Sequence, residues 1–295
     1  MRAWKRELGQ QGLDVLTRIN GGQFCRGVYL CQVDAEINVA LKLVNKRKQD
    51  AVRLLENEHD VLSRIIHPNI VQLRGALYVL AKYIGLPLEF VKGHDLCSLV
   101  MMLRDDEYIA VAALRHVCYC IFSAVEYLHT KGIYHGDLKP DNILVAARTM
   151  NEIEETTTVK LCDFGLAKVE RFATNNSRGG SIGWAAPEVF CGKRSDCYLG
   201  ELWSLGCIVF ALATNLMPFV FVNKMLEQSP FSLNVLLERM EQESMRYNDV
   251  TRGLLQNCDI KAVQSALLQF DPSARTRIPE VLTQPFFSCK AVSKT

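Results

Sequence analysis

The sequence HGDLKPDN, at residues 135–142, stands after a stretch with helical periodicity and directly before the apolar run ILV. Asp137, Lys139 and Asn142 therefore lie at the edge of a predicted core, beside a short strand that can hold them rigidly. A carboxylate can accept a proton or bind Mg²⁺, an amide oxygen can bind Mg²⁺, and a lysine can neutralise a phosphate. These are the residue types that a site for phosphate groups needs, although the stretch alone is a weak signal.

A second polar group follows a short strand in VKLCDFG, at residues 159–165. Its aspartate, Asp163, also lies beside a short strand, in this case directly after it. Phosphoryl transfer needs a base near the attacking hydroxyl, oxygen ligands for Mg²⁺ and cations on the phosphates. The pattern H-x-D-x-x-x-x-N followed by DFG supplies these groups and is a strong signal, whereas H-x-D or DFG alone is weak.

A lysine in an apolar strand lies upstream of both stretches. Alternation in NVALKLV, at residues 38–44, puts Lys42 on one face of a strand that we expect to be half-buried. In the helix predicted over residues 51–66, Glu58 shares the inward stripe. The apolar members of that stripe include Leu54, Leu62 and Ile65. An ion pair between Lys42 and Glu58 would satisfy two costly buried charges, but two side chains that snorkel to solvent explain these residues equally well.

Length, composition and charge predict a globular chain without a charged binding surface. The 295 residues suit one large domain or two lobes, and 49% hydrophobic residues provide ample surface for a core. The 34 basic and 32 acidic side chains leave a net charge of +2, and neither sign forms a long block. A nucleic-acid partner is therefore not indicated.

The N-terminus and the cysteines indicate an intracellular protein. The start, MRAWKRELGQ, lacks the apolar core of a signal peptide, and the 11 cysteines leave at least one thiol unpaired. We expect reduced, mostly buried thiols and a cytoplasmic or nuclear location. The longest uncharged run, residues 202–223, is interrupted by polar residues and a proline, so it favours a buried core helix and no membrane span.

The chain divides into a strand-rich first part and a helical second part. Short strand-like runs fill roughly the first 90 residues, interrupted by the helix at residues 51–66. After Gly93 long helical periods dominate. The predicted fold class is α+β: a small antiparallel β lobe with one main helix, at residues 1–91, and a larger, mostly helical lobe at residues 92–295.

Taken in order, these stretches resemble the motifs of a eukaryotic protein kinase catalytic domain of the serine/threonine type. VALK resembles the third-strand lysine motif, LEFVKGHDL the hinge, HGDLKPDN the catalytic loop, and ELWSLGCIVF the central helix. AAPE resembles the end of the activation segment, and its Glu188 pairs in the family with the arginine at position 275. The resemblance covers nearly the whole chain and implies a two-lobed kinase fold with a nucleotide in the cleft.

The resemblance implies a role for each polar residue of these motifs. Asp137 would accept the proton of the substrate hydroxyl, and Lys139 would neutralise the transferring γ-phosphate. Lys42, oriented by Glu58, would hold the α- and β-phosphates.

ATP and Mg²⁺ are the implied cofactors. Asn142 and Asp163 would bind the metal ion. Backbone groups and side chains from both lobes would contact the nucleotide. This nucleotide-binding set consists of Ile19, Gly22, Val28, Ala40, Lys42, Glu89, Val91, Asn142, Leu144 and Asp163.

Two residues favour serine and threonine as acceptors. Lys139 within DLKPDN resembles serine/threonine kinases, because tyrosine kinases usually have arginine and alanine in this motif. Ser181 stands where serine/threonine kinases have a threonine that bonds to the catalytic base and lysine. The implied activity is transfer of the γ-phosphate of ATP to serine or threonine hydroxyls of protein substrates; regulatory partners are not indicated.

The glycine-rich loop departs from the family pattern G-x-G-x-x-G-x-V. One register puts Asn20, Gly22 and Cys25 at the glycine positions, and another puts Gly27 before the valine. Both registers stay open. Glycines there let backbone N–H groups approach the phosphates closely, so the bulk of Cys25 predicts weakened ATP affinity.

Two further positions differ from the family. Gly136 replaces the arginine of HRD, which receives the activation-loop phosphate in kinases that phosphorylation switches on, so we expect activity independent of that switch. Glu201 replaces the central-helix aspartate that holds the backbone of the catalytic loop. The remaining histidines are expected at the surface or in loops: His94, His116 and His129.

Two other functions compete with a protein kinase. The altered glycine loop and HGD would suit a pseudokinase that acts as a nucleotide-binding or scaffold module, although no residue needed for metal, phosphate or acceptor is missing. A small-molecule phosphotransferase of kinase-like fold is disfavoured by AAPE and the DPSAR stretch, which in protein kinases shape the peptide-docking side.

Overall fold

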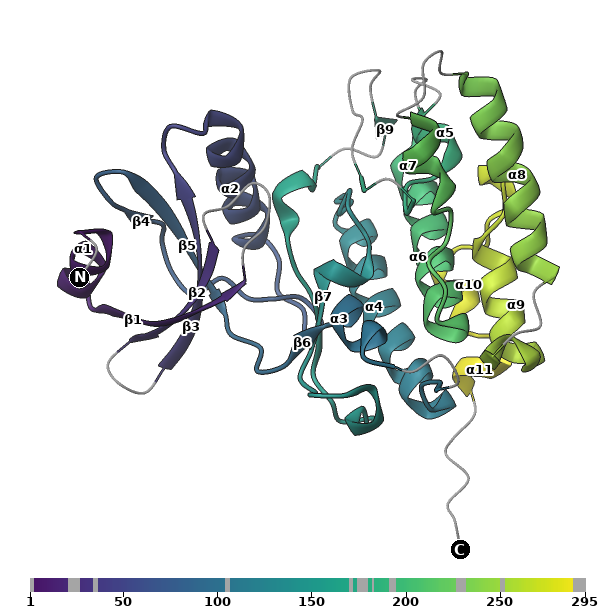
Figure 1. Ribbon diagram of the computed structural model, residues 1–295, viewed down its shortest axis with the longest axis horizontal. Coiled ribbons are helices and arrows are strands. Elements are labelled where there is room, and N and C mark those ends of the chain that lie inside the picture. Colours follow the sequence, from purple (N-terminus) through teal and green to yellow (C-terminus); the bar gives the residue numbers. More distant parts are fainter. Residues whose placement is uncertain are drawn as a thin grey trace, which may run out of the picture.

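An antiparallel sheet of five strands forms the N-terminal lobe in the described part of the computed structural model (Figure 1). The strands lie in the order β1-β2-β3-β5-β4. Their bounds are β1 (Leu13–Asn20), β2 (Gly27–Val33), β3 (Ile37–Asn45), β4 (Tyr78–Val79) and β5 (Tyr83–Glu89). The described residues are 3–20, 27–33, 37–103, 107–169, 172–173, 180–181, 183–190, 195–226, 232–249 and 253–288. The predicted nucleotide contact Gly22 lies outside them, as does Cys25.

Strand β3 is buried on both faces. Ala40 and Val44 pack in the same core as helix α2 (Gln49–Leu62), whereas Leu41 and Leu43 pack with helix α1 (Ala3–Gln10). The prediction of a half-buried strand is therefore wrong. Helix α1, which the sequence analysis does not predict, covers the second face of the strand. This N-terminal helix places Trp4 and Leu8 on the outer face of the sheet, with the rings of Trp4 and Tyr29 5.0 Å apart.

Helix α2 carries Glu58 inward, as predicted, but ends earlier than residue 66. Glu58 is completely buried. Leu55 is buried on the sheet side, whereas Leu54 is only partly buried. Leu54, a member of the predicted stripe, faces the backbone at Gly165.

A small antiparallel sheet between the lobes aligns the two polar stretches. Its three described strands are β6 (His94–Asp95), β7 (Ile143–Val145) and β8 (Val159–Leu161), in the order β6-β7-β8. Because Ile143 of β7 pairs with Leu161 of β8, the residue before β7 and the residues after β8 come together. The backbone N–H of Cys162 donates to the carbonyl of Asn142 at 2.9 Å, next to Asp163.

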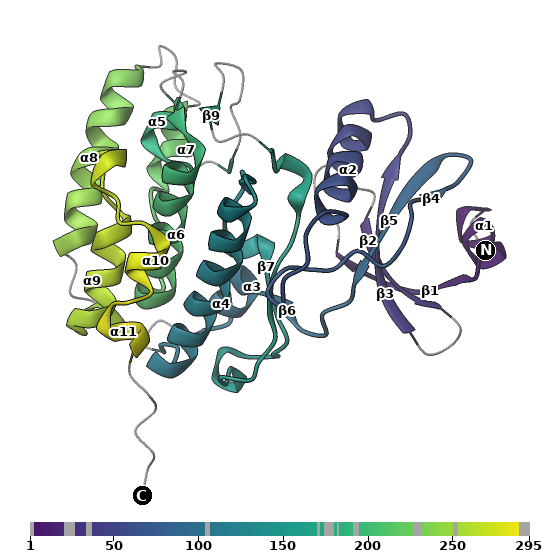
Figure 2. The same ribbon diagram turned by 180° about the vertical axis from the view of Figure 1, so that it is seen from behind.

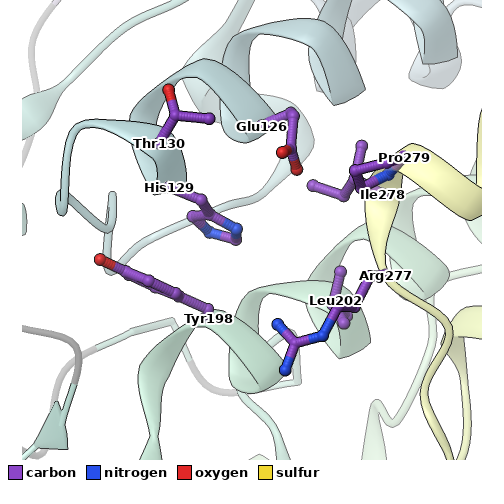
Figure 3. A pocket seen from close by; sticks show the side chains of 8 residues that line it. All are labelled: Glu126, His129, Thr130, Tyr198, Leu202, Arg277, Ile278 and Pro279. Carbon is purple, nitrogen blue, oxygen red and sulfur yellow. The ribbon is translucent and has the colours of Figure 1, made fainter.

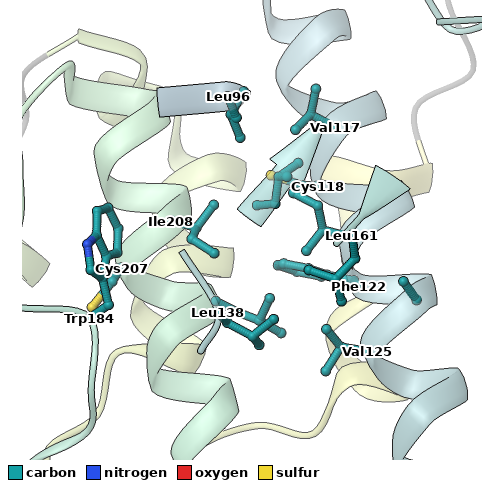
Figure 4. Close-up of a cluster of buried hydrophobic side chains, with 14 of the residues drawn as sticks. Leu96, Val117, Cys118, Phe122, Val125, Leu138, Leu161, Trp184, Cys207 and Ile208 are labelled. Atoms are coloured by element: carbon teal, nitrogen blue, oxygen red, sulfur yellow. The ribbon is translucent and has the colours of Figure 1, made fainter. Parts of the chain in front are cut away.

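Helices form most of the C-terminal lobe (Figures 1 and 2). The longest described ones are α4 (Val111–Thr130), α6 (Cys197–Thr214) and α8 (Leu233–Asp249). The shorter ones are α3 (Leu96–Met101), α5 (Pro187–Phe190), α7 (Phe221–Leu226), α9 (Cys258–Leu267), α10 (Ile278–Val281) and α11 (Pro285–Ser288). Side chains of α4, α6 and the small sheet form one core, in which Phe122, Leu161 and Ile208 are fully or almost fully buried (Figure 4).

Helices α4 and α6 are long and apolar enough to cross a membrane by composition alone. In the structure 56% of the apolar window of α4 and 78% of that of α6 are buried. Both helices pack in the core of the C-terminal lobe, as predicted for the uncharged run that begins at Leu202.

Candidate active site

Lys42 forms ion pairs with two carboxylates from different elements. Its Nζ lies 2.6 Å from Glu58 Oε2 on α2 and 2.8 Å from Asp163 Oδ1 after β8. Burial alone would lower the pKa of Lys42, but the two carboxylates outweigh it and hold that pKa well above its ordinary value. The protonated form of Lys42 is therefore favoured between these two carboxylates. Of the two alternatives open at the sequence level, the ion pair is confirmed.

Asp163 has an unusual backbone conformation. Its φ of 64° and ψ of 72° lie in the left-handed region, which few non-glycine residues adopt. Half of its side chain, 49%, is exposed. Although partial burial opposes ionisation, the charge of Lys42 holds the pKa of Asp163 below its ordinary value. The carboxylate is thus ionised and contacts Lys42 through Oδ1. An ionised carboxylate of this kind can also bind another cation.

The catalytic-loop residues form a connected group around Asp137. The backbone N–H of Ser181 donates to Asp137 Oδ1 at 2.7 Å, and Lys139 Nζ lies 2.9 Å from Asp137 Oδ2. Lys139 also donates to the hydroxyl of Ser181. These contacts confirm the predicted placement of Ser181 beside both the aspartate and the lysine.

Asn142 is oriented by the same aspartate. Its Nδ2 donates to the backbone carbonyl of Asp137 at 2.8 Å and to Oδ2 of Asp137 at 3.1 Å. Because the amide nitrogen is used in this way, Oδ1 is the atom left for a metal ion. A carboxylate and an amide oxygen are hard ligands of the type that Mg²⁺ prefers, so Asp163 and Asn142 fit the predicted metal.

Glu201 on α6 forms hydrogen bonds with the backbone of the catalytic loop. Its Oε1 accepts the backbone N–H groups of His135, at 2.7 Å, and Gly136, at 2.9 Å. Its Oε2 lies 2.8 Å from Nε2 of His129 on α4. The glutamate thus holds the loop backbone, and its longer side chain also bridges to α4.

Two histidines do not lie where we expect them. His129 bonds to Glu201 and stacks on Tyr198, with ring centroids 4.3 Å apart, and the Nε2 of His116 lies 2.7 Å from the carbonyl of Thr157. Both are part-buried residues of α4, so the expectation of surface or loop positions is wrong for them. Their partners are 72 and 41 residues away in sequence, and no local pattern reveals such contacts.

A cavity of about 230 Å³ lies beside His129 (Figure 3). Its walls come from the C-terminal part of α4, the N-terminal part of α6 and the start of α10. It is lined by Glu126, His129, Thr130, Tyr198, Leu202, Arg277, Ile278 and Pro279. The described residues that carry the predicted chemistry do not line it.

The predicted nucleotide contacts of the N-terminal lobe share one face of the sheet. Val28 pairs with Lys42 across β2 and β3, so both side chains and that of Ala40 point to the same side. Leu88, which lies in the stretch that resembles the hinge, lies opposite Ala40 on β5 and is buried. The arrangement leaves Lys42 at the inner end of an apolar surface.

The other predicted contacts lie on β1, at or just after the end of β5, and on β7. Ile19 is 43% exposed near the end of β1, Val91 and Leu144 are half-buried, and Glu89 ends β5. Glu89 forms an ion pair with Lys160 on β8 at 2.9 Å. The sequence analysis does not identify Lys160, although it has the same signal as Lys42: a lysine between apolar residues in a short strand.

Arg275 and Glu188 form the predicted ion pair in the C-terminal lobe. The two guanidinium NH groups lie 2.6 and 2.9 Å from the two carboxylate oxygens. Arg275 also donates to the carbonyls of Leu199, Gln269 and Phe270, and its side chain is completely buried. This pair fixes the end of AAPE to the helical core.

Comparison with known proteins gives the same family as the motifs. The protein kinase domain matches residues 14–287. CBL-interacting serine/threonine-protein kinase 12 of Arabidopsis thaliana is 29% identical over 279 residues, which cover 90% of this chain and 50% of that protein. Serine/threonine-protein kinase RAD53 of Saccharomyces cerevisiae is 30% identical over 273 residues, which cover 84% of this chain and 29% of that protein.

A further relative is CBL-interacting protein kinase 12 of Oryza sativa subsp. japonica, 30% identical over 287 residues that cover 92% of this chain and 47% of that protein. The chain therefore spans about half the length of the two plant proteins and less than a third of the yeast protein. With a match that extends from β1 to α11 and the polar groups in the arrangement described above, this chain belongs to the protein kinase domain family.

Proposed function

We propose that this chain is an ATP-dependent protein serine/threonine kinase. The observation that carries the proposal is the convergence of side chains from both lobes on one cleft. Lys42 of the N-terminal lobe contacts Asp163 at 2.8 Å, and Asn142, which carries the second metal-binding oxygen, contacts Asp137 at 3.1 Å. The backbone hydrogen bond from Cys162, next to Asp163, to the carbonyl of Asn142 joins these two pairs. The proposed base, metal ligands and phosphate-binding cation therefore lie in one chain of contacts.

Asp137 is the proposed proton acceptor of the substrate hydroxyl. Three donors orient its carboxylate: the N–H of Ser181, the ammonium of Lys139 and the amide of Asn142. A base held in this way needs little reorganisation when the hydroxyl arrives. Lys139 Nζ lies beside Oδ2 of Asp137, so it can neutralise a phosphoryl group that approaches this carboxylate.

ATP supplies the transferable phosphoryl group, and Mg²⁺ neutralises its developing charge. In the cleft, Lys42 is the proposed partner of the α- and β-phosphates, and Glu58 keeps its ammonium in place. Asp163 and Asn142 are the proposed metal ligands. The apolar surface formed by Val28, Ala40 and neighbouring side chains suits a purine ring.

Serine or threonine is the proposed acceptor residue in protein substrates. Lys139 contacts both Asp137 and Ser181, as expected for the serine/threonine type, and relatives carry that description in their names. The composition offers no surface for nucleic acid, and we propose a cytoplasmic or nuclear location without a membrane span. The division into lobes at residues 91 and 92 also stays a prediction.

Transfer of radiolabel from [γ-³²P]ATP to mixed serine, threonine and tyrosine peptides tests the proposal. We expect Mg²⁺-dependent labelling of serine or threonine by the wild type and loss of at least about a hundredfold in Asp137→Asn, because the general base contributes roughly 10²–10⁴. Background labelling by both proteins would instead support the pseudokinase alternative. Labelling of tyrosine alone would contradict the proposed acceptor.

A further inference from the structure

Asn57, the residue before Glu58 on α2, forms hydrogen bonds with the segment that follows Asp163. Nδ2 of Asn57 donates to the carbonyl of Ala167 at 2.8 Å and to that of Gly165 at 3.0 Å. A third, longer contact of 3.3 Å reaches the carbonyl of Phe164. One side-chain amide thus bonds to three carbonyl groups of a four-residue stretch that lies 107 to 110 residues further along the chain.

The chemistry of these partners determines which side chains can stand at position 57. All three partners are carbonyl oxygens, which only accept hydrogen bonds. The NH₂ group of Asn57 must therefore point toward them, and the reverse orientation of the amide would place oxygen against oxygen. An aspartate has nearly the same shape but offers no donor and adds a negative charge at this place.

Asn57 and Glu58 act on the same turn in complementary ways. Glu58 Oε1 accepts the backbone N–H of Phe164 at 3.2 Å, while Asn57 donates to the carbonyls that follow. Together they hold the short 3-10 turn at Phe164–Leu166 directly against α2. We call this pair of consecutive residues the α2 clamp.

The α2 clamp stands next to the strained metal-binding residue. A positive φ at a residue other than glycine is strained and persists only where the surroundings determine it. At Asp163, Lys42 holds the side chain, and the α2 clamp holds the backbone that follows. Without the donor at position 57, three carbonyl groups lose a partner, and the strained backbone at Asp163 can relax.

We propose that Asn57 is a positioning residue for phosphoryl transfer: its amide fixes the backbone after Asp163 so that this carboxylate stays directed into the cleft. The effect on catalysis rests on the proposed kinase function, whereas the effect on the backbone does not. Gly136 offers no guanidinium to an activation-loop phosphate. The hydrogen bonds of the α2 clamp, in contrast, order the backbone after Asp163 without phosphorylation.

Two substitutions of similar size separate donor chemistry from packing. In Asn57→Leu the donor is lost, and we expect the kcat for phosphate transfer to fall about tenfold, equivalent to ~1.4 kcal/mol, with the KM for ATP within about twofold. In Asn57→Asp a carboxylate faces three carbonyl oxygens, so kcat should fall further than in Asn57→Leu. If shape alone mattered, the aspartate would be the milder change.

Hydrogen exchange measured by mass spectrometry provides a readout that does not need activity. The N–H of Ala167 donates to the carbonyl of Phe164 at 3.1 Å, and it should exchange about tenfold faster in both variants, while strands β1–β5 exchange as in the wild type. Glu56→Leu, at the exposed neighbouring position, serves as the control and should leave kcat and exchange unchanged.

The order of the kcat values and exchange rates among the variants tests the proposal. Wild-type kcat and exchange in Asn57→Asp, or a milder effect of aspartate than of leucine, would overturn the proposal, as would equally faster exchange throughout the sheet. If the wild type itself transferred no phosphate, the proposed function would fail, and the exchange rates at residues 164–167 would still test the α2 clamp.

Discussion

At the scale of single residues, Gly136 has a backbone that other residues adopt only with strain. Its φ is 80°, and a Cβ atom at this position would stand 2.8 Å from the carbonyl oxygen of Leu166. We expect Gly136→Ala to lower the free energy of unfolding by about 1–3 kcal/mol, because the left-handed backbone and the close contact both disfavour a side chain. Urea denaturation followed by circular dichroism measures this change.

Gly9→Ala is the matched control for this substitution. Gly9 lies in helix α1, and a Cβ atom there would have only an ordinary contact of 3.7 Å with Asp14. Alanine is the better helix former, so this variant should be neutral or up to about 1 kcal/mol more stable. Equal losses in the two variants would show that the strain at Gly136 has no energetic effect.

Glu201 and His129 permit a second comparison at this scale. Glu201→Ala removes the acceptor of two backbone N–H groups in the catalytic loop, whereas His129→Ala removes only the bridge to α4. An unpaired buried N–H costs about 1–3 kcal/mol, so kcat should fall by tenfold or more in Glu201→Ala and by less in His129→Ala. Peptide phosphorylation rates measure both effects, and a larger loss in His129→Ala would contradict this assignment.

The residues with the predicted chemistry could be identified from the sequence because each belongs to a motif with fixed spacing. Asp137, Lys139 and Asn142 lie within eight residues, and their mutual contacts follow from the local backbone. Asn57 and Lys160 could not be assigned in this way. Their partners come from distant segments, and most asparagines on helices and lysines in strands have no such long-range partner.

At the scale of secondary-structure elements, α1 contributes a second core to the small lobe. Trp4 is 5% exposed and packs with Leu41 and Leu43 on the outer face of the sheet. Trp4→Ala should lower the free energy of unfolding by about 3–5 kcal/mol, because large buried aromatic side chains contribute that much in cores. Thermal unfolding and binding of a hydrophobic dye would show the loss, and an unchanged unfolding temperature would contradict a structural role for α1.

Helix α1 could not be predicted because it is short and only two of its residues are buried. Two apolar residues four positions apart are too few for a periodicity argument. Helices α4 and α6 and strand β3 have long apolar patterns, and these elements were predictable. The wrong expectation for β3 follows directly from the missing helix, since a strand covered on one face only would be half-buried.

Arg275 connects the AAPE segment to the helices of the large lobe. It reaches Glu188 of α5, the carbonyl of Leu199 in α6 and two carbonyls beyond α9. Arg275→Met should lower the free energy of unfolding by about 3–5 kcal/mol, because it leaves the Glu188 carboxylate and the carbonyls without their partner. A double-mutant cycle with Glu188→Gln separates the pair from packing, and a coupling energy near zero would contradict the contact.

At the scale of the whole molecule, Gly136 predicts activity without phosphorylation of the activation loop. The arginine that receives a phosphate in other kinases is absent, while the α2 clamp and Lys42 already hold Asp163. Treatment with phosphatase should leave the rate of peptide phosphorylation within about twofold of the untreated protein. Loss of activity after this treatment, and in Thr174→Ala or Ser177→Ala, would contradict the prediction; both residues lie outside the described part of the chain.

The two-lobed architecture was predictable because the period of the apolar residues changes from that of strands to that of helices near residue 93. The contacts that join the two lobes were not predictable in this way. It depends on contacts such as those of Lys42 with Asp163 and of Asn57 with Ala167, which join residues more than 100 positions apart. The family motifs imply that Lys42 and Asp163 serve one nucleotide, and physical patterns in the sequence indicate neither contact.

Calorimetric titration with ATP, in the presence and absence of Mg²⁺, tests most directly whether Lys42, Asn142 and Asp163 form one nucleotide site. We predict that the wild type binds ATP more tightly with Mg²⁺ and that Asp163→Asn loses this dependence on the metal ion. Lys42→Met should weaken ATP binding both with and without Mg²⁺. Absence of Mg²⁺-dependent binding to the wild type at millimolar nucleotide would contradict a shared nucleotide site.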